Sequence, residues 1–404
     1  MYKKLITIKK YISIGGFGMR SLKKVALVFA LVAMSTCLFA GGSSESSTAY
    51  KIGFIGPMTG DNANYGILCS QAVKLAVDQA NAQGGINGTQ IELIIEDSEG
   101  NQEKGMAAIE KLSSTDKISC LVGPVFTGVS FAVGERCQAE GIPMMSPSAT
   151  HKDITAIGDY VFRTVVSDGL QGEVAGHYFY EVLGYRNIGC LYIKNDYSQG
   201  LYEGMKAAFE ACGGKVSAVE TAQLGDKDFK TQLTKLKAAN VEAIYIPNYT
   251  VEMAQQLEQA AQVGLNVPFL SCDGFSNPEI YDLAGDYTNG VIYIAPTQVE
   301  ESDAYKQFVA DYTAAFGVAP DSFATNAFDA TNIYIKVMKE VGSDRTAIRN
   351  GVASIKDYQG VTGTVNFAEN GDLIAYQGVY RVENQTPIYI GAYTVDGGKL
   401  IEVK

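Results

Sequence analysis

Short apolar runs alternate with helical patterns of apolar residues in the first part of the chain. The first run, 51–56, ends in Gly-Pro, and apolar residues then recur at helical spacing at Leu68, Ala72, Leu75, Ala76 and Ala80. Further strand-like runs lie at 91–95, 118–122 and 142–145, with helical stretches near 105–112 and from Gly128. Alternation of strands and helices predicts a parallel sheet covered by helices.

A second series of the same kind begins near Asn187. It has strand-like runs at 188–193, 216–221, 243–246, 268–270 and 291–294, with helical stretches at 201–212 and 253–261. Two more helical stretches, near 308–316 and 326–340, precede a glycine-rich β segment from Val361 to the end. The two series favour an α/β fold of two doubly wound parallel-sheet units, and 404 residues are enough for two cores.

The first 40 residues have the pattern of a secretory signal peptide. Arg20, Lys23 and Lys24 precede the apolar stretch 25–39, which is short for a membrane span. Met19 begins a conventional signal by itself, so translation starting at Met19 is one hypothesis. The sequence therefore predicts a periplasmic or other extracytoplasmic protein.

The processing of this segment has two alternatives. Cleavage after Ala40 would release a soluble protein, whereas cleavage before Cys37 would leave a lipid anchor on that cysteine. Residues 41–49 form a polar tether that suits the anchored form. Both alternatives stay open.

Charge and cysteine content narrow the classes of partner. Of the 32 Lys and Arg residues, seven lie in the first 40, so 25 basic residues oppose 44 acidic ones in the remainder, a net charge of about −19. Such a surface repels phosphate backbones, which argues against nucleic acid as a partner. The scattered cysteines form no Cys-x-x-Cys and the chain has two histidines, so we expect no metal site.

Ligands of open parallel sheets bind beyond the carboxyl ends of the strands. Residues that follow predicted strands there are Tyr65, Thr127, Ser148, Thr150, Tyr197, Tyr249 and Asp273. Thr127 fits an ordinary N-cap before a helix starting at Gly128, and equally a hydroxyl that holds a carboxylate. Asp273 before Gly274 fits a turn, and equally a partner for an ammonium group.

Enzyme motifs are missing from the sequence. The first strand turn lacks Gly-x-Gly-x-x-Gly, and the chain contains neither a phosphate-binding Gly-x-x-x-x-Gly-Lys-Ser/Thr loop nor a Gly-x-Ser-x-Gly elbow. His151 is the one histidine near the predicted cleft, and its neighbours Lys152 and Asp153 favour an idle surface residue. We therefore expect neither catalysis nor a cofactor.

Five motifs in order resemble those of the periplasmic leucine/isoleucine/valine-binding proteins, the type I branched-chain amino-acid receptors of ABC transporters. They are Ile-Gly-Phe-Ile-Gly-Pro-Met-Thr-Gly at 52–60, Gly-Gly-Ile-Asn-Gly at 84–88, Val-Gly-Pro at 122–124, Ser-Pro-Ser-Ala-Thr at 146–150 and Asp-Tyr-Ser-Gln-Gly at 196–200. The resemblance runs from about Tyr50 to the C-terminus. It implies a monomer that captures a branched-chain or other hydrophobic amino acid and delivers it to an ABC permease.

The same resemblance implies roles for single residues. Thr127, Ser148 and Thr150 match the ligand-carboxylate site, Asp273 matches the acid that holds the α-ammonium, Tyr197 and Tyr249 match cleft aromatics, and Tyr65 and Phe328 match positions near the ligand side chain. Some members carry a disulfide at positions that here are Glu99 and Phe126, so that bridge is missing.

The resemblance also implies discontinuous lobes joined by a three-strand hinge. Lobe 1 would comprise 50–166 and 297–375, and lobe 2 would comprise 167–296 and 376–404, with crossings near Val166, Pro296 and Tyr376. Three alternatives remain: a receptor for an amide, urea or aromatic acid with the same fold, a ligand-sensing receptor domain, and an enzyme. The sensor is disfavoured because no second membrane segment or signalling domain follows in this sequence.

Overall fold

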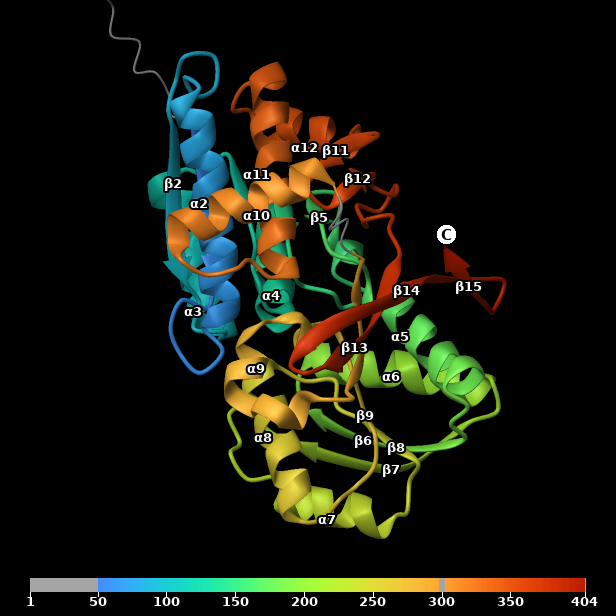
Figure 1. Ribbon diagram of the computed structural model, residues 1–404. Helices are drawn as coiled ribbons and strands as arrows, with labels where there is room; N and C mark the ends of the chain where they lie inside the picture. Colours follow the sequence, from blue (N-terminus) through green and yellow to red (C-terminus); the bar gives the residue numbers. More distant parts are fainter. Residues whose placement is uncertain (1–49, 298–301, 404) are drawn as a thin grey trace, which may run out of the picture. The chain divides into compact units, whose positions relative to one another are not determined.

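The computed structural model describes residues 50–297 and 302–403. The predicted signal peptide (1–40), its alternative start at Met19, Cys37 and the tether (41–49) lie outside these residues. The described residues form two α/β lobes, each built on its own main sheet (Figure 1). Among them, no helix combines the length and hydropathy needed to cross a membrane.

The sheet of the first lobe is entirely parallel, with the order β2-β1-β3-β4-β5. Its strands are β1 (Tyr50–Gly56), β2 (Ile91–Asp97), β3 (Cys120–Val122), β4 (Met144–Ser146) and β5 (Val161–Arg163). One face carries α2 (Asn64–Ala82), α10 (Asp303–Phe316), α11 (Ser322–Val341) and α12 (Arg345–Ala353), and the other carries α3 (Gln102–Glu110) and α4 (Thr127–Glu140). Because helices cover both faces, β1 reads as a continuous apolar run with Ile52, Phe54 and Ile55 fully buried.

The sheet of the second lobe is mixed, with the order β15-β14-β13-β10-β9-β8-β6-β7. The parallel strands are β6 (Asn187–Ile193), β7 (Lys215–Ala222), β8 (Ala243–Tyr245), β9 (Phe269–Ser271) and β10 (Ile292–Pro296). The antiparallel strands are β13 (Gln377–Glu383), β14 (Thr386–Asp396) and β15 (Lys399–Val403). In Figure 1, α5 (Asp168–His177) and α6 (Asp196–Ala211) cover one face, and α7 (Lys230–Ala238), α8 (Thr250–Gln262) and α9 (Glu279–Ala284) cover the other.

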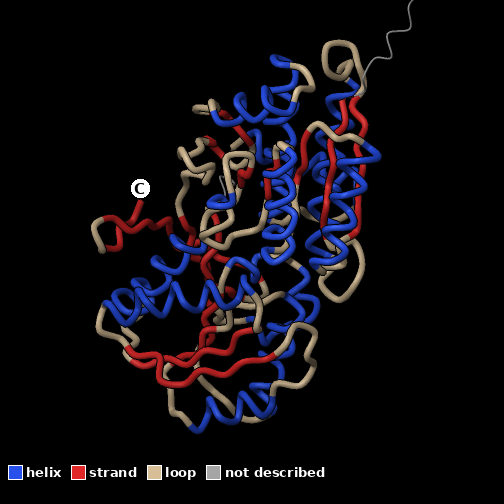
Figure 2. Tube along the Cα trace, turned by 180° about the vertical axis from the view of Figure 1, so that it is seen from behind, coloured by secondary structure: helices blue, strands red, loops and turns tan. Residues whose placement is uncertain are grey.

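Short elements complete the fold. The hairpin β11 (Tyr358–Gly360) and β12 (Gly363–Val365) follows α12, and single helical turns are η1 (Lys111–Asp116), η2 (Thr155–Ile157), η3 (Tyr178–Val182), η4 (Asp273–Ser276) and η5 (Gly285–Thr288). The chain passes between the two groups of elements after β5, after β10 and before β13. Figure 2 traces these passages from behind, with helices on both sides of each set of strands.

The structure confirms the predicted α/β alternation but contains elements that the sequence pattern missed: β5, α5, α7 and α12. Helix α5 was missed because Gly169, Gly172 and Gly176 dilute its apolar pattern. Helix α7 buries only Leu233 and Leu236, which is too few for a clear period. All six cysteines of the described residues are unpaired, and Cys120, Cys190 and Cys272 are buried at or beside strands, as expected for small apolar side chains.

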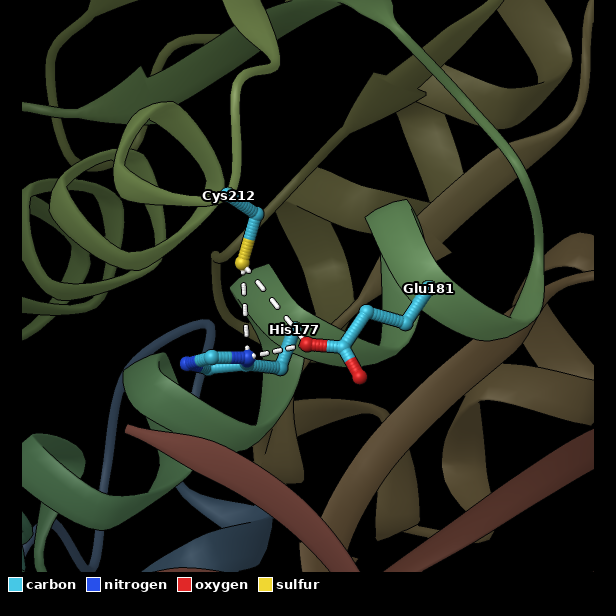
Figure 3. Close-up of side chains that lie close together, drawn as sticks. All are labelled: His177, Glu181 and Cys212. Atoms are coloured by element: carbon cyan, nitrogen blue, oxygen red, sulfur yellow. Dashed lines mark hydrogen bonds and ion pairs between the residues drawn. The ribbon is translucent and has the colours of Figure 1, made fainter. Parts of the chain in front are cut away.

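Helices α5 and α6 cross at close range through glycine. A Cβ on Gly172 would lie 2.7 Å from the carbonyl carbon of Gly204 on the facing helix. Side chains at and just beyond the C-terminal ends of both helices come together there, namely His177, Glu181 and Cys212 (Figure 3).

Candidate functional site

A pocket with about 260 Å³ of empty space, part of it open to solvent, lies between the two lobes. The loops that follow the carboxyl ends of strands in both sheets reach it, as expected for parallel sheets. Its lining is Tyr65, Val125, Phe126, Thr127, Ser148 and Phe323 from the first lobe and Tyr197 and Tyr249 from the second. Both lobes therefore contribute to one site.

Three aromatic rings stack across the boundary between the lobes. The rings of Tyr197 and Tyr249 have centroids 5.0 Å apart and planes within 15°. Phe126 stacks on the other side of Tyr249 at 4.7 Å. This wall gives the pocket an apolar side.

Tyr65 belongs to the pocket lining and also ties the lobes together. Its hydroxyl donates to the carbonyl of Gly274 at 2.9 Å and lies 2.7 Å from the Thr250 hydroxyl. Both partners belong to the second lobe, whereas Tyr65 lies on α2. Asn62 and Asn64 make further bonds of this kind, to Glu252 at 3.3 Å and to Asn277 at 3.1 Å, so the described arrangement is a closed one.

Two threonine hydroxyls of the first lobe are buried without a hydrogen-bond partner among the described residues. They belong to Thr127 and Thr150, which are 2% and 0% exposed. Helix α4 begins at Thr127 itself and not at Gly128, and no side chain caps it. The predicted N-cap role of Thr127 is therefore wrong, and its hydroxyl and the helix N-terminus are both left for a ligand.

Ser148 differs from the two threonines. Its hydroxyl donates to the carbonyl of Val125 at 2.7 Å, which holds two pocket loops together. The main chain beside it is held as well, because the Ala149 N–H donates to the Ser146 hydroxyl at 2.9 Å. Ser148 therefore shapes the pocket through its side chain.

Asp273 is the first residue of η4 and is fully buried. Tyr197 donates its hydroxyl to Asp273 Oδ1 at 2.7 Å, and the Asp273 N–H donates to Gln171 Oε1 at 3.1 Å. Its second oxygen, Oδ2, has no partner among the described residues. Burial raises the pKa of Asp273 to about 6. The hydrogen bonds with Tyr197 and Gln171 oppose this rise.

Asp168, which the sequence analysis missed, is a second buried acid of this site. It is 2% exposed, and neither carboxylate oxygen meets hydrogen-bond geometry with a described residue. Burial, and then the charge of Asp273, raise the pKa of Asp168 well above its usual range, while the nearby Thr150 hydroxyl and Arg163 oppose the shift. The sequence signal for Asp168 was the helix start Ser167-Asp168. It was missed because the helix that begins there, α5, was not predicted.

Phe328 lies away from the pocket lining. It packs on α10 residue Phe308, with ring centroids 4.7 Å apart. Phe323, earlier on the same helix, lines the pocket instead, and its ring is 5.8 Å from that of Tyr65. Thr150 and Asp273 lie just behind the lining, buried against it.

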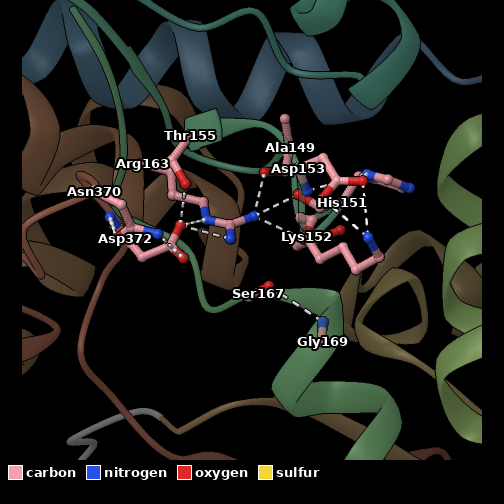
Figure 4. Close-up of polar contacts among 11 residues, drawn as sticks. Ala149, His151, Lys152, Asp153, Thr155, Arg163, Ser167, Gly169, Asn370 and Asp372 are labelled. Atoms are coloured by element: carbon pink, nitrogen blue, oxygen red, sulfur yellow. Dashed lines mark hydrogen bonds and ion pairs between the residues drawn. The ribbon is translucent and has the colours of Figure 1, made fainter. Parts of the chain in front are cut away.

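A buried guanidinium holds the loop that carries Thr150 (Figure 4). Arg163 is fully buried, and its Nη1 donates to the carbonyls of Thr150 and His151, each at 2.8 Å. Its Nε donates to Asp372 Oδ1 at 2.8 Å, and its Nη2 forms an ion pair with the same oxygen at 2.6 Å. Asp372 belongs to the segment that leads into β13, so one side chain fixes the pocket loop and a chain crossing together.

The polar groups of the cleft suit a small molecule that carries both a cation and an anion. Two buried carboxyls attract a cation, and two free hydroxyls beside a helix N-terminus attract an anion. Within the part of the chain that the structure describes, the one cluster of three potential metal ligands lies outside this cleft, at His177, Glu181 and Cys212.

Comparisons with known proteins show the family of the chain. Residues 49–386 match the model of a family described as "Periplasmic binding protein". The leucine-, isoleucine-, valine-, threonine-, and alanine-binding protein of Pseudomonas aeruginosa is 32% identical over 343 residues, covering 84% of this chain and 91% of that protein.

Two solved structures extend the comparison. LivJ of Streptococcus pneumoniae, a branched-chain amino acid transporter substrate-binding protein solved with isoleucine, has a TM-score of 0.80 at 28% identity, covering 88% of this chain and all of that one. A solute-binding protein of an ABC transporter from R. palustris, solved with benzoate, has a TM-score of 0.79 at 22% identity, covering 85% of this chain and 96% of that one. At 22% identity this similarity shows the fold alone.

The Arg163 network generates a stability prediction. Arg163→Met should lower the free energy of unfolding by about 3–5 kcal/mol, because Asp372 and two buried carbonyls lose their donor. Urea denaturation measures the loss. Lys152→Met is the control, since its pair with Asp153 in the same loop is solvent-exposed and is worth at most about 1 kcal/mol. Equal losses in the two variants would contradict the assigned role.

Proposed function

Because the chain belongs to the periplasmic binding protein family, we propose that it captures a hydrophobic amino acid, most simply a branched-chain one, and delivers it to an ABC importer. One observation carries the proposal. Two carboxyls and two hydroxyls are buried around a pocket with an aromatic wall, and most of their oxygen atoms have no partner among the described residues. A hydrophobic amino acid has the cation, the anion and the apolar side chain that complete this set.

Asp273 and Asp168 are suited to bind the cationic part of the ligand. A desolvated ammonium needs a counter-charge, and Asp273 Oδ2 is a buried acceptor without a donor. Asp168 contributes a second carboxyl, which extends the site beyond the residue matched by resemblance. We propose that the α-ammonium binds between these two acids.

Groups of the first lobe are suited to bind the anionic part of the ligand. The Thr127 hydroxyl and the N-terminus of the 14-residue helix α4 offer donors and a positive dipole end. Thr150 adds a hydroxyl whose loop Arg163 holds in place. We propose that these groups bind the ligand carboxylate, with Ser148 shaping the loop between them.

The aromatic wall accounts for the preference among side chains. Tyr65, Tyr197 and Tyr249 line the pocket together with Val125 and Phe323, and none of these is charged. An aliphatic side chain fits such a surface better than a charged one. Phe323, and not Phe328, is the phenylalanine we propose near it.

The lobe boundaries that we propose are 50–166 plus 297–375 for lobe 1, and 167–296 plus 376–404 for lobe 2. The sheet membership of the strands supports them, as does the packing of α10 and α11 against α2. The three crossings then act as a hinge. Ligand favours the closed form because only there do both lobes touch it.

The family places the protein outside the cytoplasm. We propose in addition that residues 1–40 are a signal peptide, that 41–49 tether the protein, with Cys37 as the alternative lipid site, and that the protein acts as a monomer without turnover of its ligand. The aromatic-acid alternative is weaker, since two buried carboxyls repel an anion that brings no ammonium.

A set of matched ligands tests the function. Leucine, isoleucine or valine should bind, whereas 4-methylpentanoate, which lacks the ammonium, and 3-methylbutylamine, which lacks the carboxylate, should each bind roughly thirtyfold or more weakly. Isothermal calorimetry on the purified protein measures this. Tighter binding of benzoate or of an amide than of every amino acid would overturn the proposal.

Removing the charge at Asp273 should weaken binding. Asp273→Asn keeps the shape but loses the carboxylate, so amino-acid affinity should fall by roughly thirtyfold or more. Calorimetry compares it with Asp282→Asn, a substitution on α9 outside the pocket lining, which should bind as the unmodified protein does. An Asp273→Asn affinity within about threefold of the original, in a folded protein, would exclude Asp273 as the ammonium partner.

Affinity should also depend on pH. The pKa of Asp273 is raised to about 6 in the free protein, and a bound ammonium favours its ionised form. Affinity should therefore fall as the pH drops through 6, by about tenfold per pH unit for the proton that Asp273 loses on binding, and Asp168, whose pKa is also raised, adds to the fall. The groups facing Asp273 are Asp168, Cys272, Tyr65, Tyr197, Tyr245 and Tyr249.

Calorimetry at several pH values gives the profile. Asp273→Asn should make the fall shallower. A profile that stays level down to pH 5 in the unmodified protein would contradict the assignment.

A further inference from the structure

Three potential metal ligands of different chemistry meet at one point of the second lobe, away from the amino-acid cleft (Figure 3). His177 Nδ1 lies 2.6 Å from Glu181 Oε1 and 3.3 Å from Cys212 Sγ, and that sulfur lies 3.9 Å from the same carboxylate oxygen. Asp168 opens α5 and His177 closes it, about 13.5 Å further along at the helical rise. The cluster is therefore separate from the pocket.

The arrangement does not suit a proton relay. In a nucleophile–base–acid chain, the histidine uses one ring nitrogen for the nucleophile and the other for the acid. Here the same atom, Nδ1, faces both the thiol and the carboxylate. Three Lewis-basic atoms that converge on one point, with one nitrogen shared between two neighbours, suit a bound cation instead.

The surroundings also favour a cation. Helix α6 ends at Ala211 and Cys212 is its C-cap residue, so the cluster lies at the negative end of the helix dipole. Glu181 adds a charge, and its side chain is 43% exposed while that of His177 is 10% exposed. The ring is thus held inside the protein while the carboxylate side stays open to water.

From this convergence of imidazole, carboxylate and thiol we propose that His177, Glu181 and Cys212 form a site for a borderline-soft divalent cation, with Zn²⁺ as the best match. These are the donor atoms that Zn²⁺ uses, and the open side leaves room for water as a fourth ligand. The site could not be predicted from a spacing motif, because Cys212 is 35 residues from His177 in the chain. The role of the ion is to link the C-terminal ends of α5 and α6.

Binding has a defined proton balance. Burial and the nearby Glu181 raise the pKa of the Cys212 thiol, so the free site holds the proton on sulfur. When the sulfur–zinc bond forms, the sulfur–hydrogen bond breaks and the proton leaves to solvent. No electron is transferred in this step.

The experiment titrates ZnCl₂ into untagged, metal-free, reduced protein by calorimetry. We expect one Zn²⁺ per chain, release of protons detected by comparing buffers, and slower alkylation of Cys212 followed by peptide mass spectrometry. CaCl₂ and MgCl₂ should give no such protection, because they prefer oxygen ligands.

Variants identify the ligands. Cys212→Ser and Glu181→Gln should each weaken Zn²⁺ binding by roughly tenfold or more, whereas Glu203→Gln, an exposed acid on α6 that accepts from Gln199, should leave it unchanged. Unchanged amino-acid binding in Cys212→Ser shows that the variant is folded and separates this test from that of the cleft. No Zn²⁺ binding by the unmodified protein, or equal affinity in Cys212→Ser, would overturn the proposal.

Discussion

Two carboxyl groups, Asp168 and Asp273, are buried near one another, and neither forms an ion pair with a described Lys or Arg, although the charge of Arg163 acts on Asp168. A buried carboxyl without a counter-charge is unfavourable as an anion, which is why the pKa of each is raised. Protonation relieves this cost, and the cation that we propose between the two acids would relieve it as well.

Other parts of the lobes serve to hold these acids in place. Tyr197 and Gln171 occupy one oxygen and the main chain of Asp273, which leaves the other oxygen in a fixed position. Tyr65 bonds Gly274, the next residue, from across the cleft. The described arrangement has direct contacts between the lobes, and a ligand that touches both lobes would favour it.

The sequence predicted the architecture because a strand buried on both faces and an amphipathic helix have distinct periods. It also placed candidate residues at the right loops, since position beyond the carboxyl end of a parallel strand is fixed by topology. It failed where the deciding fact was three-dimensional. Asp168 opens a glycine-rich helix with a weak period, and the choice between Phe323 and Phe328 depends on how α11 is rotated.

The role of Thr127 shows a different limit. A threonine or serine before a helix looks the same in the sequence whether its hydroxyl caps that helix or binds a ligand. A shift of one residue in the helix start separated the two roles. The cluster of His177, Glu181 and Cys212 was invisible for a related reason, because residues far apart in sequence meet only after α5 and α6 pack through glycine.

The order of strands has a consequence for how the protein is made. The strands β1 to β5 emerge first, yet α11, which covers one face of their sheet, follows only after β10. The second sheet in turn waits for β13, which lies among the last residues and pairs directly with β10. Neither hydrophobic core is therefore complete in any N-terminal portion of the chain. In a chain made N-terminus first, both cores are completed only when its last strands are present.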